Sequence, residues 1–279
     1  MNFKSLFNKN PICRFIFNKW RGTEISLHKT FIYNFIAFPF KDAIKFPLWI
    51  YQNTKIEHIG KIEIIVPIKP GMIRIGKRVF FRNIQTTIIN NGTIVFEGNC
   101  SILGGTNLYV LKNKSKVYFG KDVMIGEKNT IIADENIEIG DYTRIAFNSL
   151  IMNTDAHYLI NLNNGIIKNC KAPIIIGNYN WIGNNTTIKK GTITPDYCIV
   201  SSNSMLMRDY SKYEKYSLIT GKPGVVKETK FRRIYNDIQS SFLDNYFDTH
   251  NTTEITIPKQ EDDQYYNWLC NEDINVHSH

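Results

Sequence analysis

Large apolar residues return every six positions through much of this 279-residue chain. A period of six fits neither an amphipathic helix, which needs about 3.6 residues per turn, nor an alternating strand of period two. It fits a chain that forms a short strand and turns a corner every six residues, so that three strands make a coil of about 18 residues. One inward side chain per face then stacks on the coil below. The sequence therefore predicts a mainly β fold, a parallel β-helix solenoid. The series is Phe96, Ile102 and Leu108; Phe119, Ile125 and Ile131; Ile139, Ile145 and Ile151; and Ile176, Ile182, Ile188, Thr194, Val200 and Leu206.

An Ile/Val-x-Ile/Phe-Gly/Glu opening precedes the coils, and the spacing of these openings locates an insertion. The positions Ile75, Phe96, Phe119, Ile139 and Ile176 are 21, 23, 20 and 37 residues apart. The last interval holds one coil of about 18 residues and about 19 more. We expect this excess to form a long loop over residues 158–173 beside the solenoid.

Three regions follow from the extent of the repeat. Residues 1–58 lack it and carry a net charge of +6, so we expect an N-terminal cap of helices and loops over the first coil. Contact of this segment with an anionic membrane surface is the alternative, because basic residues alternate with Phe and Trp. Residues 59–226 should form the solenoid. Residues 227–279 should form a C-terminal helix, predicted over 227–247 by apolar residues at helical spacing, and a poorly ordered acidic tail.

The net charge of +9 is unevenly distributed. Residues 254–279 carry −5, residues 1–253 carry +14, and residues 222–233 alone carry +4. The basic cluster indicates an anionic partner such as phosphate, nucleic acid or an acidic membrane surface. Nucleic acid is disfavoured because the aromatic residues of the repeat are not interleaved with basic ones along one surface.

Cysteine usage and hydropathy predict the compartment. Five scattered cysteines without a CxxC pair indicate buried thiols of a reducing compartment. Charges interrupt every N-terminal apolar run, and the most apolar stretch, residues 31–51, contains Lys41, Asp42 and Lys45. Neither a secretory signal nor a membrane span of about 20 apolar residues is expected. We therefore expect a cytoplasmic protein, either soluble or attached peripherally to the inner face of the cell membrane.

His157 interrupts the apolar ladder and is the first candidate for chemistry. The six-step count from Ile151 lands on it, and the long insertion follows directly. Imidazole is the side chain best suited to accept a proton near neutral pH, and Asp155 could orient it or stabilise its charge. No metal is expected, because His157 is the only histidine between residues 73 and 206.

Four ordered motifs resemble the hexapeptide-repeat acyltransferases of the galactoside, maltose and capsular-sugar O-acetyltransferase type, whose fold is a left-handed parallel β-helix. The Asp155-x-His157 pair resembles their catalytic histidine motif. The segment 172–194, with Trp181-Ile-Gly, resembles their WIG…I..G segment, residues 199–208 their following coil, and residues 219–227 their closing GNPAK turn. In place of the small residues of their GAGS segment, this chain has Ser201, Ser202 and Asn203.

The resemblance implies a role for each of these residues. His157, assisted by Asp155, would deprotonate an acceptor hydroxyl, which attacks the thioester of acetyl-CoA directly, and Asn153 and Tyr158 would contact the acceptor. Trp181 and Asn184 would line the acyl and pantetheine channel. The backbone N–H of Ser202 would meet the pantetheine arm or the thioester oxygen. Arg208, Lys222 and Lys227 would meet the CoA phosphates. Members work as homotrimers whose active sites lie between subunits.

Several functions remain open at this point. The leading one is acetyl-CoA-dependent O-acetylation of a sugar hydroxyl on a cell-surface polysaccharide or its precursor. N-acetylation of an amino-sugar nucleotide, or acetylation of serine, is an alternative within the same fold. A non-catalytic scaffold or glycan-binding solenoid is an alternative of another class, because stacked β-coils also serve as rods and binding surfaces. The inward Ile residues are structural in every case, and Trp181 could equally be a buried corner aromatic.

Overall fold

The computed structural model describes residues 24–250, 252–257 and 266–270. Its contacts divide the chain into two units, Met1–Lys230 and Phe231–His279. Of the expected N-terminal cap, residues 1–23 lie outside the described part, as does most of the expected acidic tail.

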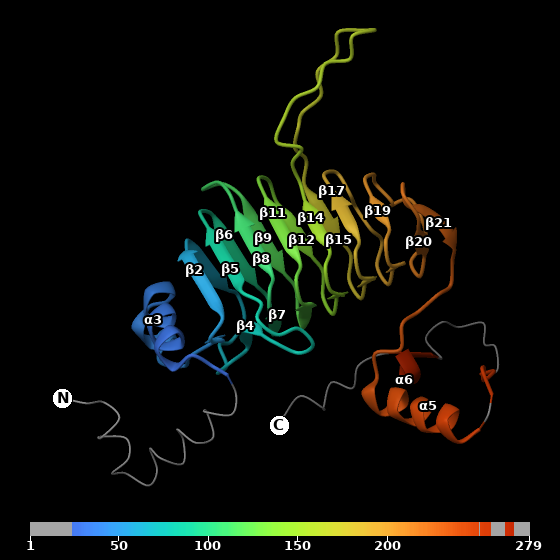
Figure 1. The fold of residues 1–279 in the computed structure, drawn as a ribbon, viewed down its shortest axis with the longest axis horizontal. Coiled ribbons are helices and arrows are strands. Elements are labelled where there is room, and N and C mark those ends of the chain that lie inside the picture. The colour runs from blue at the N-terminus through green and yellow to red at the C-terminus, as the bar shows by residue number, and fades with distance from the viewer. Residues whose placement is uncertain (1–23, 251, 258–265, 271–279) are drawn as a thin grey trace. The chain divides into compact units, whose positions relative to one another are not determined.

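The first unit consists of three sheets that the chain visits in turn (Figure 1). The first sheet has the order β1 (Leu48–Ile50), β4 (Ile73–Lys77), β7 (Cys100–Leu103), β10 (Val123–Ile125), β13 (Arg144–Ile145), β16 (Trp181–Ile182), β18 (Ile199–Val200), β20 (Leu218–Thr220) and β21 (Val225–Glu228). The second contains β2 (Thr54–His58), β5 (Thr86–Asn90), β8 (Asn107–Val110), β11 (Thr130–Ala133), β14 (Leu150–Met152), β17 (Thr187–Lys189) and β19 (Met205–Leu206). The third contains β3 (Lys61–Ile64), β6 (Thr93–Phe96), β9 (Lys116–Phe119), β12 (Ile137–Ile139) and β15 (Ile174–Ile176).

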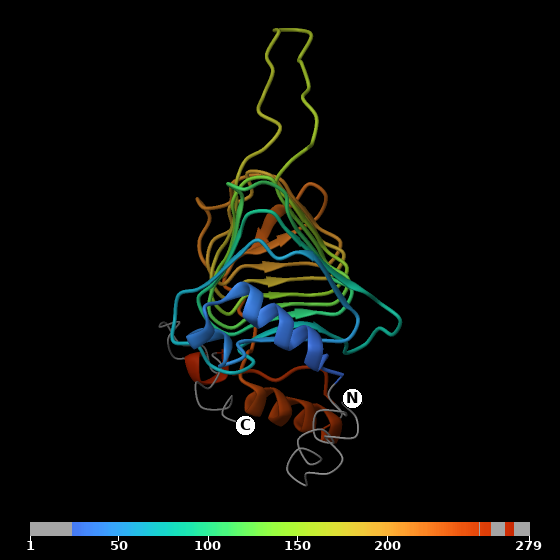
Figure 2. The same cartoon turned by 90° about the vertical axis from the view of Figure 1, so that its left-hand side faces the viewer.

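The coils are triangular and left-handed. Neighbouring strands within the three sheets are parallel, apart from the antiparallel pair β20–β21. Figure 2 looks along the solenoid from its N-terminal end, and there the chain follows the first sheet at the base, rises along the second and descends along the third as it recedes. This counter-clockwise path defines a left-handed helix, so the predicted fold class is confirmed.

The core is the ladder that the six-residue period predicts. Ile125, Ile131, Ile139, Ile145 and Ile151 are all fully buried, as are their equivalents in the neighbouring coils. Strand register stacks each on its counterpart, for example Phe119 on Ile139 and Ile139 on Ile176. Burying one such side chain contributes about 1.5–3 kcal/mol, so the stacked ladder is the main source of stability.

The N-terminal end of the solenoid is closed by helix α3 (Leu27–Ala37), followed by α4 (Phe40–Ala43). The side chain of Asn34 accepts from the backbone N–H of Leu48 at 3.0 Å and donates to its carbonyl oxygen at 2.8 Å, while Thr30 Oγ1 accepts from Ile50 N at 3.0 Å. These side chains take the hydrogen bonds that a preceding strand would make with β1. The sheets begin earlier than expected, since β1 and β2 lie within the segment assigned to the cap.

The C-terminal helix begins later than the sequence predicts. Residues 225–228 are strand β21 rather than helix, and α5 spans Asp237–Thr249, followed in the second unit by α6 (Asn267–Cys270). Strand β20 would otherwise be an edge strand with unpaired backbone N–H and C=O groups. Strand β21 pairs with it, Val225 with Thr220 and Val226 with Ile219. Helix α5 starts where Asn236 accepts a hydrogen bond from Gln239 N, the usual role of an N-cap residue. In the described part of the chain, no helix combines the length and apolarity needed to cross a bilayer.

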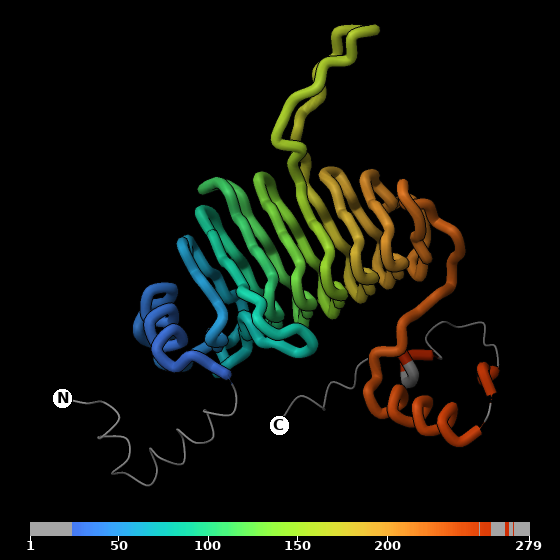
Figure 3. The backbone as a smooth tube through the Cα atoms, viewed as in Figure 1, coloured from blue at the N-terminus to red at the C-terminus, as the bar shows by residue number. Residues whose placement is uncertain are grey.

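Two insertions leave the solenoid at different corners. Residues 153–173, here called the arm, project from the corner that joins the second and third sheets, which we call the arm corner (Figure 3). Residues 78–85 project from the corner that joins the first and second sheets, which we call the Asn184 corner. The buried carboxylate of Glu127 holds this shorter loop by accepting hydrogen bonds from the backbone N–H groups of Val79 and Phe80, both at 2.8 Å.

Candidate active site

The arm is ordered at its base by backbone hydrogen bonds between its two limbs. Thr154 and Lys171 form an antiparallel bridge, and Asp155 N donates to the carbonyl oxygen of Cys170 at 2.7 Å. Figures 1 and 3 show the limbs running outward together from the coils. Beyond the base the arm carries exposed apolar side chains, including Leu162, which is 88% exposed. Such exposure is unusual for a segment that works in isolation.

His157 lies on the outgoing limb of the arm and is exposed. The count of six places it in the apolar ladder, and this placement is wrong, because the chain leaves the coil after Met152. Ala156 adopts φ 61°, in the left-handed region, and its N–H donates to Thr154 Oγ1 at 3.0 Å, which turns the chain outward just before His157. Within the described residues nothing bonds to the imidazole, so both ring nitrogens are available to a substrate.

Asp155 is held by two lysines rather than by the imidazole. Its Oδ2 lies 2.8 Å from Lys190 Nζ and its Oδ1 lies 3.2 Å from Lys189 Nζ. The hydrogen bond from Lys190, and then that from Lys189, lowers the pKa of this carboxyl below its usual range. In this chain Asp155 therefore anchors the arm, and its expected contact with the imidazole is not seen.

The two expected acceptor contacts differ in kind. Asn153 is fully buried; its Oδ1 accepts from Asp134 N at 2.8 Å and its Nδ2 donates to Asn136 O at 3.2 Å. These bonds complete a corner of the coil and use the buried amide of Asn153, which does not favour the expected contact with an acceptor. Tyr158, by contrast, is exposed beside His157, and a hydrogen bond with Cys170 is the main cause that raises its pKa.

Asn184 and Ser202 meet at the corner named after Asn184. Ser202 Oγ donates to Asn184 Oδ1 at 2.5 Å, and Asn203 N donates to Asn184 O at 3.0 Å. In the described part of the chain no acceptor takes the backbone N–H of Ser202, and the residue is exposed. A Cβ on Gly183 would lie 2.5 Å from Ser202 N, so only glycine permits this approach of the two coils. The corner offers a donor N–H beside an amide side chain.

Trp181 lies on the outer face of the first sheet, in register with Arg144 and Ile199, and is 40% exposed. It leads directly into the Asn184 corner, three residues before Asn184. The ring of Trp181 is therefore not buried in the core, and the interpretation of Trp181 as a buried aromatic residue at a corner is wrong.

The three expected phosphate contacts are exposed on the last coils. Arg208 follows β19, Lys222 lies in the turn after β20, and Lys227 lies on β21. The hydroxyl of Tyr210 donates to Gly224 O at 2.9 Å and Gly224 N donates to Met205 O at 2.7 Å. These bonds hold the turn that contains Lys222 against the coil that contains Arg208.

A single chain keeps the two halves of the candidate site apart. His157 belongs to the arm corner, whereas Asn184 and Ser202 belong to the Asn184 corner. The second sheet lies between the corners, and at about 3.3 Å per residue its six-residue face spans about 20 Å. One chain alone therefore does not place the imidazole beside the Ser202 N–H.

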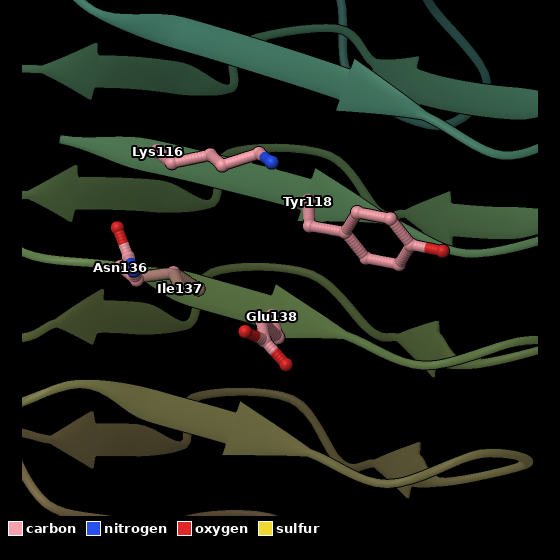
Figure 4. A pocket seen from close by; sticks show the side chains of 5 residues that line it. All are labelled: Lys116, Tyr118, Asn136, Ile137 and Glu138. Carbon is pink, nitrogen blue, oxygen red and sulfur yellow. The ribbon is translucent and has the colours of Figure 1, made fainter. Parts of the chain in front are cut away.

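Lys189 and Lys190 are the site residues that sequence reasoning missed. Both stand inside the resembling segment 172–194, directly after Ile188, which stacks on Ile151 just before the insertion. This register is the signal that could have placed them at the base of the arm. A surface depression of about 160 Å³ was not predicted either; it lies on the outer face of β9 and β12 and is lined by Lys116, Tyr118, Asn136, Ile137 and Glu138 (Figure 4). In the described residues no group of three or more His, Cys, Asp or Glu side chains could hold a metal ion.

Comparison with known proteins gives one similar sequence and several distant structures. No protein-family model matches the chain. The polysialic acid O-acetyltransferase of Neisseria meningitidis is 30% identical over 129 residues, covering 38% of this chain and 60% of the relative. The chain thus matches less than two thirds of that relative's length.

Among solved structures, the polySia-specific acetyltransferase NeuO is 18% identical, covers 70% of this chain and 98% of its own, and has a TM-score of 0.39. The polysialic acid O-acetyltransferase OatWY is 20% identical, covers 78% and 96%, and has a TM-score of 0.38. The chain is thus similar over 129 residues to a polysialic acid O-acetyltransferase, and its left-handed coils agree with the resemblance to hexapeptide-repeat acyltransferases.

Proposed function

We propose that this protein is an acetyl-CoA-dependent O-acetyltransferase that acetylates a sugar hydroxyl of a cell-surface polysaccharide or its precursor. The observation that carries the proposal is His157, an exposed imidazole without a partner in the described chain, set two residues beyond the anchored Asp155. The name of the meningococcal relative makes a sialic acid polymer the first acceptor to test.

The chemistry is a direct transfer with His157 as general base. Its imidazole accepts the proton of the sugar hydroxyl while the oxygen attacks the thioester carbonyl. The C–S bond then breaks, an O-acetyl ester forms, and the CoA thiolate takes the proton back from the imidazolium. The Ser202 N–H would stabilise the negative charge that develops on the thioester oxygen.

The CoA side of the site would be the Asn184 corner and the last coils. Trp181 and Asn184 offer an aromatic face and an amide to the pantetheine arm. Arg208, Lys222 and Lys227 supply exposed cations for the CoA phosphates, which are best recognised by charged donors. That the turn with Lys222 is fastened to the coil with Arg208 supports a shared role for these cations.

The active site would be complete only in a homotrimer, where the arm of one chain reaches the Asn184 corner of the next. The separation of the two corners within one chain and the exposed apolar side chains of the arm support this arrangement. We further propose that the protein works in the cytoplasm, either soluble or attached peripherally to the inner face of the cell membrane. The supply of acetyl-CoA and the basic N-terminal segment support that location.

The decisive experiment measures acetyl transfer from acetyl-CoA to glycan acceptors by the wild type and by His157→Ala. We expect a loss of about 10²–10⁴-fold, as for removal of a general base, while acetyl-CoA still raises the melting temperature of the variant. The matched control is His58→Ala, which removes an exposed histidine on β2. Undiminished transfer by His157→Ala would contradict the proposed base. An alkali-stable product would indicate an amide and therefore an amino-sugar acceptor.

A further inference from the structure

One ammonium group joins both limbs of the arm to the coil that follows it. Lys190 Nζ lies 2.8 Å from Asp155 Oδ2 on the outgoing limb and 2.6 Å from Asn169 O on the returning limb. Lys189 Nζ adds a second contact, 3.2 Å from Asp155 Oδ1. Both lysine side chains are only 25% exposed. The three contacts form a bridge that is partly shielded from water.

The returning limb is also fastened to the coils that precede it. Lys171 Nζ lies 3.6 Å from Glu135 Oε1 and 3.9 Å from Asp134 Oδ1, and Lys112 Nζ lies 2.6 Å from the same Asp134 oxygen. The base of the arm is therefore fixed from both directions along the solenoid. A network of this kind constrains geometry more than a single exposed ion pair does, because several bonds must break together.

The position of His157 depends directly on this base. Ala156 alone separates it from Asp155, and the backbone of Ala156 is set by its hydrogen bond to Thr154 Oγ1. Beyond His157 the arm is exposed and has no packed core to fix it. A displacement of Asp155 would therefore displace the imidazole by a similar distance. A displacement of about 1 Å can lower the rate of a reaction about 10²-fold.

We propose that Lys190, supported by Lys189, is a positioning residue: it holds Asp155 and the returning limb so that His157 stands at the place where it removes the acceptor proton. This rests on the proposed function of His157. Asp155 then fixes the position of His157 through the backbone that joins them. It does so by pairing with lysine and not by a direct hydrogen bond to the imidazole.

The test compares Lys190→Ala with Lys190→Arg and with the control Lys168→Ala, which removes an exposed arm lysine that has no partner among the described residues. We expect Lys190→Ala to lower kcat about tenfold with the KM for acetyl-CoA unchanged, Lys190→Arg to recover most of the loss, and Lys168→Ala to behave as wild type. The double variant Asp155→Asn/Lys190→Ala should fall no further than the worse single variant, as expected for two residues that act through one contact. A kcat of Lys190→Ala equal to that of the wild type would overturn the proposal, as would additive losses.

Amide hydrogen exchange gives a second readout that does not depend on activity. The N–H groups of Asp155 and Ala172, which are bonded to Cys170 O and Asn153 O, report the closed base of the arm. We expect them to exchange about tenfold faster in Lys190→Ala and at the wild-type rate in Lys190→Arg and Lys168→Ala. Unchanged exchange in Lys190→Ala overturns the anchoring. Wild-type enzyme that acetylates no glycan, with exchange as expected, would instead contradict the proposed function and leave the anchoring intact.

Discussion

At the scale of single residues, Asp155 shows how a carboxylate can serve a site without touching the reacting group. Its two oxygens are engaged by the cations of two neighbouring positions on one strand end, Lys189 and Lys190. Charge-assisted bonds of this kind are stronger than neutral ones, and here they act two residues from the imidazole.

The ion pairs of Asp155 make the arm sensitive to acid. Because the pKa of Asp155 is lowered on folding, chiefly by Lys190, its contribution is fully present above the ordinary aspartate pKa of about 3.9 and is lost as the pH falls through the lower folded-state value. A carbon-13 NMR titration of the Asp155 carboxyl should therefore give a midpoint below that of an ordinary aspartate. In Lys190→Ala the midpoint should rise toward it. A wild-type midpoint at or above the ordinary value would contradict the pairing.

The sequence identifies residues of the candidate site better than it predicts what those residues contact. His157, Asn184 and Ser202 stand at motif positions, and the structure brings Asn184 and Ser202 within 2.5 Å of each other. The partners of Asp155 lie 34 and 35 residues further along the chain. The register of β14 with β17, which pairs Met152 with Lys189, brings both lysines to the start of the arm, but the direction in which Asp155 leaves the coil is set by the inserted segment. The periodic pattern therefore predicts which strands lie side by side, but not the course of a segment inserted between them.

At the scale of elements, each strand of the solenoid separates two kinds of side chain. In β14, Ile151 points into the ladder and is fully buried, while its neighbour Met152 lies half-buried on the outer face. Neighbouring coils repeat the arrangement, with Ile131 and Ile188 in register with Ile151. Only the inward-facing positions repeat as large apolar residues every six positions.

Truncation of these two neighbours should separate their contributions to stability. We expect Ile151→Ala to lower the free energy of unfolding by about 2–5 kcal/mol, because a cavity opens in the ladder. Met152→Ala should cost less than about 1.5 kcal/mol, since a half-buried outer position can be refilled by water. Urea unfolding followed by circular dichroism measures both. Equal losses would show that the ladder does not dominate the stability of the coil.

Element boundaries at the ends of the solenoid could not be predicted from periodicity. Residues 225–228 fall within a stretch of helical apolar spacing, yet they form β21 because the edge of β20 is available for pairing. That edge exists only after the coils have formed. Likewise β1 and β2 lack the recurring ladder in the sequence, and their place in the sheets is set by pairing with β4 and β5.

At the scale of the whole molecule, the two units differ in how they are stabilised. The buried apolar core runs from Leu48 to Ile219, with Val226 packed against it, and so lies within the first unit. Helix α5 of the second unit has no buried residue. The free energy of folding of the coils should therefore be almost independent of residues 231–279.

Removal of residues 231–279 tests this independence. We expect the shortened protein to keep the unfolding transition of the coils, with a change below about 1 kcal/mol, because no ladder residue is lost. Thermal melting followed at the β-sheet signal in circular dichroism is the measurement, with the full chain as reference. A clearly lower stability would mean that the second unit supports the solenoid.

The hydrogen bonds of Asn34 and Thr30 to β1, together with the antiparallel strand β21 beyond β20, have a consequence for the behaviour of the protein at high concentration. A stack of like coils could in principle add further chains end to end, since its last strand resembles every strand before it. Here side chains of a helix occupy one terminal strand, and a strand of reversed direction with charged Lys227 and Glu228 covers the other. The protein is therefore protected against growing into filaments by the same segments that complete its first sheet.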